Sequence, residues 1–244
     1  MSKLRLPLVP ALALCVIACS GGDAGLSSDA GHGNDAPPGA TSASNHLDNP
    51  SFENGRAPWF SLVESSPYWM DFTVTETRAH TGSHSAVLDL HSRGEIARGV
   101  RVWGVVADLD PEALPRRIAG HYRVETWQRG TARQYVQVAL SIEVARNRDP
   151  LQLAWILCGI DAAPFSIANR KFVFTGPKEP EQDAWVAFDI DVHEALRREW
   201  GVNYPATLAF ESVRIFFEAR FDRYEESDGP VGGRVYYDDL YFGN

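Results

Sequence analysis

Apolar and polar side chains alternate with a period of two along several runs of this 244-residue chain, and this alternation constrains the fold more than any other feature. The run "YVQVALSIEV" (residues 135–144) has Val, Leu or Ile at every second position. The runs "WVAFDIDV" (185–192) and "SVRIFFEARF" (212–221) alternate in the same way. Neighbouring side chains of a β-strand point to opposite faces of its sheet, so each run predicts a strand. We therefore expect antiparallel sheets with one buried face each.

The other regular patterns indicate that strands dominate the chain. Further strand candidates lie at residues 72–78, 84–90, 99–109, 116–127, 151–160, 172–176 and 234–242. A helical pattern stands out at residues 192–201, where Asp191 can act as the N-cap, Glu194 follows three residues later and Gly201 can end the helix. Many strands with one short helix predict an all-β sandwich or barrel.

The first residues carry the features of an export signal. Lys3 and Arg5 precede an apolar run that is too short to span a bilayer, as in a signal peptide over residues 1–18. The run ends on "VIAC", which resembles a bacterial lipobox, and this resemblance implies that Cys19 becomes lipidated. Ser20 follows instead of Asp, which by the same resemblance favours the outer membrane or cell surface. An ordinary secretory signal that contains a cysteine is the alternative.

Composition changes sharply after the signal. Residues 19–45 are rich in Gly, Ser, Ala, Asp and Pro, which predicts a disordered tether. Residues 46–244 are long enough for one β-sandwich domain with its own core. After cleavage and lipidation Cys158 is the only thiol left, so we expect no disulfide and a buried, inert cysteine. The formal net charge of −9 argues against nucleic acid as a partner, because its phosphates would be repelled. No other stretch approaches transmembrane length, so we expect contact with a membrane through the lipid anchor only.

Three motifs follow one another along the predicted domain: "NPSFENGRAPWF" (49–60), "ETRAHTGSHSAVLDL" (76–90) and "VYYDDLYF" (235–242). This order resembles the jelly-roll carbohydrate-binding modules of the galactose-binding-like group, which are found beside bacterial xylanases and glucanases. The resemblance implies a jelly-roll β-sandwich of two antiparallel sheets, with the first and last segments side by side. Together with the lipobox, it implies an envelope-anchored lipoprotein that binds a glycan or polysaccharide without cleaving it.

The same resemblance implies a structural calcium ion where the two ends of the domain meet. In the family the ion is held by the Glu of the opening motif and an Asp of the closing motif, which correspond to Glu53 and Asp238. Hard carboxylate oxygens suit Ca²⁺. The alternative is that both carboxylates cap turns or accept backbone N–H bonds. In the same motifs we expect Phe52 in the core and turns at residues 54–55 and 81–82.

Two predicted strands carry the mixture of side chains with which the resembled family binds sugars on a concave sheet. Sugar rings have apolar C–H faces and hydroxyl rims, so aromatic and planar polar side chains together match both. If residues 116–127 and 135–144 form a hairpin with its turn at 129–131, their non-core faces share one trough. The expected ligand residues are His121, Arg123, Glu125, Trp127, Tyr135 and Gln137. The alternative is a solvated outer face in which Trp127 packs under a loop.

Other residues give weaker patterns. His80 and His84 have a spacing that would suit zinc on a helix, but they lie in a predicted turn. An acidic cluster is similar to the carboxylates of jelly-roll glycoside hydrolases; its members are Asp189, Asp191, His193 and Glu194. A hydrolase or polysaccharide lyase is therefore one alternative function. Four tryptophans could line a site but are expected more often in the core: Trp59, Trp69, Trp103 and Trp155.

A third hypothesis is a surface lipoprotein that binds a protein partner or spaces components of the envelope. Residues 108–180 exceed what a minimal carbohydrate-binding module needs. The "ARNRDP" and "TGPKEPEQD" segments within or beside this stretch could then be the binding elements. Glycan binding is the leading hypothesis, and the protein partner and the enzyme are its alternatives.

Overall fold

The computed structural model describes residues 45–61, 69–92, 97–107, 114–129, 133–144, 149–160, 167–201, 210–222 and 230–244. The predicted signal peptide, the lipidation site Cys19 and nearly all of the tether lie outside these ranges, so they stay predictions. Within the described part of the chain, no helix is long and apolar enough to cross a membrane.

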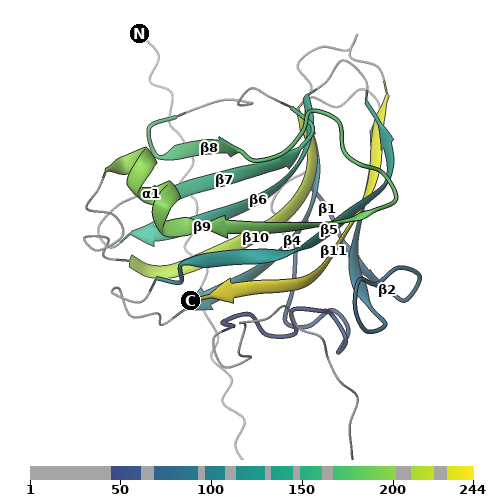
Figure 1. The fold of residues 1–244 in the computed structure, drawn as a ribbon, viewed down its shortest axis with the longest axis horizontal. Coiled ribbons are helices and arrows are strands. Elements are labelled where there is room, and N and C mark those ends of the chain that lie inside the picture. The colour runs from purple at the N-terminus through teal and green to yellow at the C-terminus, as the bar shows by residue number, and fades with distance from the viewer. Residues whose placement is uncertain are drawn as a thin grey trace, which may run out of the picture. The chain divides into compact units, whose positions relative to one another are not determined.

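The strands of the described residues form two sheets, accompanied by one helix (Figure 1). Sheet A has the order β1 (Trp69–Met70), β4 (Ala97–Ala107), β10 (Phe210–Asp222), β6 (Arg133–Val144), β7 (Leu151–Cys158) and β8 (Arg170–Phe174). Sheet B has the order β2 (Thr73–Thr75), β3 (Ser85–Ser92), β11 (Val231–Gly243), β5 (Arg117–Gln128) and β9 (Trp185–Asp191). The predicted all-β jelly-roll sandwich is confirmed.

Neighbouring strands run antiparallel in both sheets except at the two edges of sheet A. There β1 pairs parallel with β4, and β8 pairs parallel with β7. The expectation of purely antiparallel sheets is corrected at these two pairs. Alternating side chains indicate which face a residue occupies, and they carry no information about the direction of the neighbouring strand.

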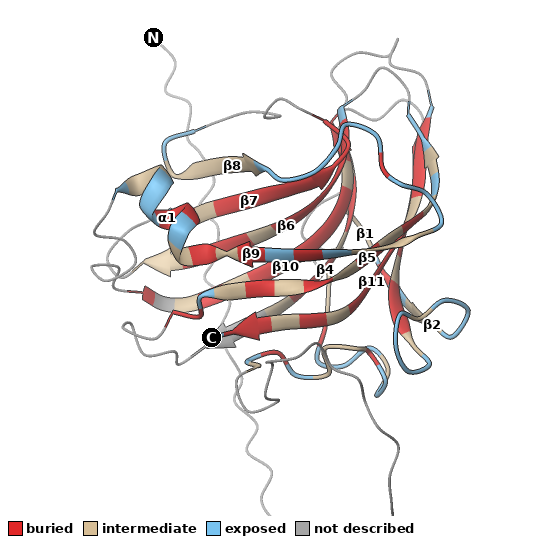
Figure 2. Ribbon diagram, viewed as in Figure 1, coloured by how far each residue is buried: buried red, intermediate tan, exposed pale blue. Residues whose placement is uncertain are grey.

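The core lies between the inner faces of the two sheets, where the predicted apolar positions are buried (Figure 2). On β10, Ile215 and Phe217 have no exposed surface. Tyr237 of β11 links the sheets, because its hydroxyl lies 3.1 Å from the carbonyl oxygen of Gln137 and 3.2 Å from that of Glu218. A buried tyrosine needs such partners for its polar end, so this contact also fixes how the sheets face each other.

The predicted helix forms as α1 (Val192–Trp200). The Asp191 side chain accepts a hydrogen bond from the backbone N–H of Glu194 at 2.8 Å. Gly201 ends the helix with a positive φ of 112°, and its N–H donates to the carbonyl oxygen of Arg197. The apolar side of α1 packs against the core through Val192, Ala195 and Leu196.

The opening motif packs beside the closing strand, as expected. The N–H of Leu240 donates to the carbonyl oxygen of Pro50 at 3.0 Å, and the N–H of His46 donates to that of Phe242 at 2.8 Å. Phe52 is fully buried, which confirms it as a core residue. The two predicted turns also form, with a positive φ at the glycine of each: 79° at position 55 and 63° at position 82.

Candidate functional site

The predicted hairpin between residues 116–127 and 135–144 does not form. The first run becomes β5 in sheet B, and the second becomes β6 in sheet A. β5 pairs with β11 and β9, whereas β6 pairs with β10 and β7. The expected ligand residues are therefore divided between two sheets, and the prediction of one shared trough is wrong.

A β-bulge in β5 turns Trp127 away from the outer face. Val235 pairs with Val124 and Arg234 pairs with Thr126, so Glu125 is an extra residue in the ladder. One inserted residue moves every later side chain of the strand to the opposite face. Trp127 consequently packs against the core, and its indole nitrogen is buried. The expectation that it lies on the ligand face is wrong.

The other three predicted residues of β5 lie on the outer face of sheet B, where they contact groups of the protein itself. Arg123 pairs with Asp183 at 2.9 Å. Glu125 accepts a hydrogen bond from the Tyr236 hydroxyl at 3.0 Å. His121 stacks on His80, with 3.6 Å between ring centroids. Each of the three side chains is thus held by another side chain of the protein on this face of the sheet.

Tyr135 and Gln137 do lie on a shared outer face, that of sheet A, but both are completely buried. The Tyr135 hydroxyl donates to Asp222 at 2.8 Å, and the Gln137 amide donates to the Glu218 carboxylate. Burial raises the pKa of Tyr135 well above its usual range. Neither side chain has a surface that a sugar could contact. Each instead holds the acidic side chain beside it in place through a hydrogen bond.

A groove of about 250 Å³ lies on the outer face of sheet A, and Glu218 is among the residues that line it. Phe216 of β10 stands opposite Ala139 of β6, which in turn stands opposite Ala154 of β7. The small side chains of these two alanines, on β6 and β7, leave a hollow, and Ser141 extends its floor. The larger lining residues are Trp69, Arg98, Arg101, Gln152, Arg170, Phe216, Glu218 and Arg220. The volume is just below the range of about 300–1,000 Å³ for small-molecule sites.

Two aromatic rings and a guanidinium form one wall of the groove. The Arg101 guanidinium carbon lies 3.8 Å from the Trp69 ring centroid and 4.7 Å from that of Phe216. Both rings keep part of their surface exposed. Gly99 makes this arrangement possible, because a Cβ at that position would lie 2.0 Å from the Trp69 ring. Trp69 thus packs directly against β4 at Gly99, which has no side chain.

A buried carboxylate holds the arginines of the groove together. The Glu218 side chain is 2% exposed, and its Oε1 lies 2.7 Å from Nε of Arg101. Burial alone would raise the pKa of Glu218, but Arg101 and Arg220 hold it below its ordinary value. Arg220 also pairs with Asp222 at 2.6 Å. Glu218 is therefore ionised at neutral pH, where it can accept hydrogen bonds and cannot donate a proton.

Two carboxylates of the acidic cluster at the end of β9 are engaged in structural contacts. Asp191 caps α1 and pairs with Arg116 at 2.8 Å, while Asp189 pairs with Arg117 at 2.7 Å. Burial alone would raise the pKa of Asp191, but the N–H of Glu194 and Arg116 hold it below its ordinary value. A glycosidase acid needs a carboxyl with a raised pKa, so these contacts favour the helix-cap alternative.

The two carboxylates predicted to hold calcium accept backbone N–H bonds, as the alternative interpretation of these residues expects. Glu53 Oε1 accepts from both N–H groups of residues 83–84 at 2.8 Å. Asp238 accepts from the N–H groups of residues 80–81 and of Asp239. Burial and the Asp239 carboxylate raise the pKa of Asp238 to about 7. The amide hydrogens that point at these oxygens carry partial positive charge, so the arrangement does not suit a bound cation. Calcium binding stays a prediction, and these contacts do not favour it.

We expect the thermal unfolding temperature to be the same in EDTA and in added Ca²⁺, because backbone N–H groups already satisfy Glu53 and Asp238. Differential scanning calorimetry of the protein in both conditions measures this. A rise in the unfolding temperature with Ca²⁺ would support the calcium site if Glu53→Gln removes the rise. Glu76→Gln is the matched control, since Glu76 is 79% exposed.

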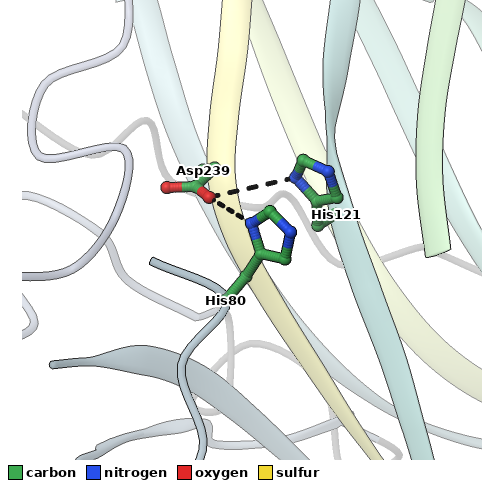
Figure 3. A group of neighbouring side chains, drawn as sticks. All are labelled: His80, His121 and Asp239. Atoms are coloured by element: carbon green, nitrogen blue, oxygen red, sulfur yellow. Dashed lines mark hydrogen bonds and ion pairs between the residues drawn. The ribbon is translucent and has the colours of Figure 1, made fainter. Parts of the chain in front are cut away.

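His80, His121 and Asp239 form a cluster beside Asp238, and Figure 3 shows them converging from three segments. His80 Nδ1 lies 2.6 Å from the Asp239 carboxylate, and His121 Nδ1 lies 3.9 Å from it. The two rings are stacked within 17° of parallel. A metal ion binds in the plane of an imidazole, and stacked rings have no common plane, so this arrangement is a hydrogen bond with a ring stack. His84 faces Glu53, so the His80–His84 pair does not share a ligand.

The groove residues Trp69, Arg101 and Glu218 were not among the expected ligand residues. The run 212–221 did contain a signal, because Phe216, Glu218 and Arg220 occupy its non-core positions. Of the four tryptophans considered for a site, Trp59 and Trp155 are buried in the core, and Trp103 is buried on the outer face of sheet A against Phe60 and Phe216. Trp69 is the one of the four that lines the groove.

The comparisons with known proteins give likenesses of fold. No family model matches the chain, and no curated protein matches it. A chain from a study of the promiscuous specificity of carbohydrate-binding modules from the β-sandwich superfamily is 10% identical, with a TM-score of 0.48; the match covers 84% of this chain and 64% of that one. A module of the CBM28 type, specific for non-crystalline cellulose, is 15% identical with a TM-score of 0.44, over 80% of this chain and 93% of that one. The CBM22-2 xylan-binding domain of Paenibacillus barcinonensis Xyn10C is 13% identical with a TM-score of 0.38, over 79% and 96%. These three are described as carbohydrate-binding modules, and the likeness to them is one of fold.

Proposed function

We propose that the protein binds a polysaccharide in the groove on the outer face of sheet A and does not cleave it. The observation that carries the proposal is the combination of partly exposed Trp69 and Phe216 rings with planar polar side chains over a floor of small residues. Aromatic faces suit the apolar C–H faces of sugar rings, and the polar groups suit their hydroxyls.

The polar residues around the floor offer both kinds of hydrogen bond. The Gln152 amide and the Ser141 hydroxyl, which line the groove, can each donate and accept a hydrogen bond. Arg101 can donate from its place between the two rings. A sugar hydroxyl is itself a donor and an acceptor, so a pyranose that lies on the floor would find partners on several sides.

The contacts of the carboxylates at and below the groove support binding without cleavage. Hydrolysis of a glycosidic bond requires two carboxyl groups, one of which must be protonated at the working pH. The pKa of Glu218 is held below its ordinary value by Arg101 and Arg220, after burial is taken into account. Asp222 is already bonded to Tyr135 and Arg220. If Cys19 is lipidated as the sequence predicts, the tether would present this non-catalytic groove at the outer membrane or cell surface.

Filling the groove tests the proposal without removing any contact residue. Ala139→Trp places a large ring on the floor, so we expect it to abolish the retardation of the protein in native gels that contain the bound polysaccharide. Ala187→Trp is the matched control, because Ala187 is exposed on β9 of sheet B. Thermal unfolding of both variants confirms that they are folded.

The outcome decides between the hypotheses. Loss of retardation in Ala139→Trp with retention in Ala187→Trp supports glycan binding in this groove. Equal retardation of both variants places any binding elsewhere on the molecule. If the wild-type protein is not retarded by any member of a broad polysaccharide panel, the hypothesis of a protein partner replaces the present one.

A further inference from the structure

We infer that the groove recognises the end of a glycan chain and not its interior, an inference that rests on the function proposed above. The volume of the groove, about 250 Å³, suits a short piece of a polysaccharide. An internal piece continues in two directions, so it needs a groove that is open at two ends. An end piece continues in one direction and needs a single opening.

The floor of the groove follows β6 and β7 for a short distance. Ala139 and Ala154 stand opposite each other on these two strands. In one direction the next outward residue of β6 is Ser141, which also lines the groove. In the other direction the next outward pair is Gln137 and Ile156. Outward positions recur at every second residue of a strand, so small side chains give way to large ones directly beyond the alanines.

Large buried side chains close the groove at that end. Tyr135, Ile156 and Ile160 form a small hydrophobic cluster apart from the main core, with exposed fractions of 0%, 1% and 5%. Phe172 of β8 packs against this cluster, and Gln137 has no exposed surface. A side chain on the outer face of a sheet is buried only when other groups cover it. The described residues therefore leave no room for a sugar ring beyond the alanine floor in this direction.

The groove is also bounded on the sides that face the edges of sheet A. The wall described above, with Trp69 and Arg101, stands on β1 and β4. On the opposite side Arg170 of β8 lines the groove, and its guanidinium carbon lies 5.0 Å from the Phe172 ring centroid. β1 and β8 are the first and last strands of this sheet among the described residues. A glycan chain that ran across the strands would have to pass over both walls.

The remaining end of the groove is in contact with water. Gln152 stands opposite Ser141 there, and both side chains line the groove. Next to Ser141, Arg214 and Glu143 form an ion pair whose side chains are 43% and 32% exposed. A chain can thus leave the groove past Ser141. This geometry fits a terminal ring over Ala139, with the rest of the chain directed toward the opening.

The closed end is what distinguishes a terminal ring from an internal one. An internal ring over Ala139 would direct its second neighbour into the buried cluster of Tyr135 and Ile156. A terminal ring has a hydroxyl where the internal ring has its second glycosidic bond, so it makes no such clash. The tip of a side branch is a chain end of the same kind. The groove therefore selects the ends of linear chains and of branches.

The test compares glycans of one backbone that differ only in length. Calorimetric titrations use three pairs: xylobiose and xylohexaose, cellobiose and cellohexaose, and mannobiose and mannohexaose. For a pair that binds, we expect the two molar affinities to agree within about twofold, because the additional rings lie outside the groove. A hexasaccharide that binds about threefold tighter than its disaccharide, or more, would overturn the inference, since its inner rings would then contribute contacts.

Partial acid hydrolysis extends the test to any polysaccharide that retards the protein in affinity gels. Hydrolysis raises the number of chain ends in a given mass of polymer and leaves the type of ring unchanged. We expect the amount of protein bound per gram of polymer, measured by calorimetric titration, to rise with the number of ends. A constant amount would indicate internal binding and would contradict end recognition. Borohydride reduction then distinguishes the two ends, because it opens the ring at the reducing end and leaves the other end intact.

Ile156→Ala tests whether the outer cluster closes the groove. The substitution places a second small residue beyond Ala154 on the outer face and so lengthens the floor. We expect the variant to bind the hexasaccharide at least about threefold tighter than the disaccharide. Phe174→Ala is the matched control, because Phe174 stands beside Ile156 on β8 but is 41% exposed, and it should keep equal affinities. Equal affinities in an Ile156→Ala variant that thermal unfolding shows to be folded would overturn the inference.

The remaining outcomes separate this inference from the function on which it rests. Affinity that grows with length in the wild type overturns end recognition and leaves glycan binding intact. Absence of binding to every polysaccharide of the panel and to every oligosaccharide pair overturns the proposed function itself. Oligosaccharide binding that Ala139→Trp does not reduce would place the chain-end site outside this groove and would also overturn the inference.

Discussion

Glu218→Ala should lower the free energy of unfolding by about 3 kcal/mol. The substitution leaves Arg101 and Arg220 without their shared carboxylate and removes the hydrogen-bond acceptor of the fully buried Gln137. Breaking a buried ion pair typically costs about 3–5 kcal/mol, and the lower end applies because Arg101 is 15% exposed. Urea denaturation monitored by tryptophan fluorescence measures the change.

Asp189→Ala is the matched control for this prediction. The Arg117–Asp189 pair has the same 2.7 Å separation as the Arg101–Glu218 pair, but the Asp189 side chain is 61% exposed. Exposed pairs contribute about 0–1 kcal/mol, so the control should unfold almost as the wild-type protein does. Equal destabilisation by the two substitutions would contradict the importance of burial at Glu218.

Glu218→Gln separates stability from binding. It keeps the size of the side chain and removes its negative charge, so we expect lower stability than in the wild type. Because the Glu218 side chain is only 2% exposed, the bound polysaccharide does not reach it, and the affinity should change little. A variant that loses stability and also loses affinity would mean that Glu218 contacts the ligand as an acceptor.

Local sequence patterns were sufficient for the elements of the fold. The alternation in residues 212–221 identified the inward positions of β10, including the fully buried Phe217. The helix signals at Asp191 and Gly201 marked both ends of α1. These predictions succeeded because strand faces and helix caps depend on residues that are close together in the chain.

The candidate site depended on information that no local pattern contains. Residues 116–127 and 135–144 were both strands, yet which sheet each joins is decided by pairing with β11 and β10, far along the chain. Tyr135 was expected to be exposed because its position is non-core, but Asp222 and the Arg220 guanidinium cover it. The bulge at Glu125, which reverses Trp127, is an insertion of one residue relative to β11. Each error came from a long-range contact.

The second large effect concerns two tryptophans. Trp69 lines the groove, whereas the bulge turns Trp127 toward the core. Trp69→Ala should lower the affinity for the bound polysaccharide at least about thirtyfold, because truncation of a central aromatic contact commonly costs about 2 kcal/mol or more. Its stability should change little, since the ring lies on the outer face. Trp127→Ala should keep its affinity and lose about 2–3 kcal/mol of stability, because its ring packs against the core. Calorimetric titration and urea denaturation of both variants measure the two quantities.

A third variant distinguishes the presence of the Trp69 ring from its position. Gly99→Val keeps the tryptophan but places a Cβ where the ring now lies, since that atom would come within 2.0 Å of it. The ring must then leave β4 and its place beside Arg101. If position matters, Gly99→Val loses affinity as Trp69→Ala does, although every aromatic residue of the groove is still present. If affinity survives in Gly99→Val and falls in Trp127→Ala, the ligand contacts the face that carries β5, and the groove of sheet A is a structural hollow.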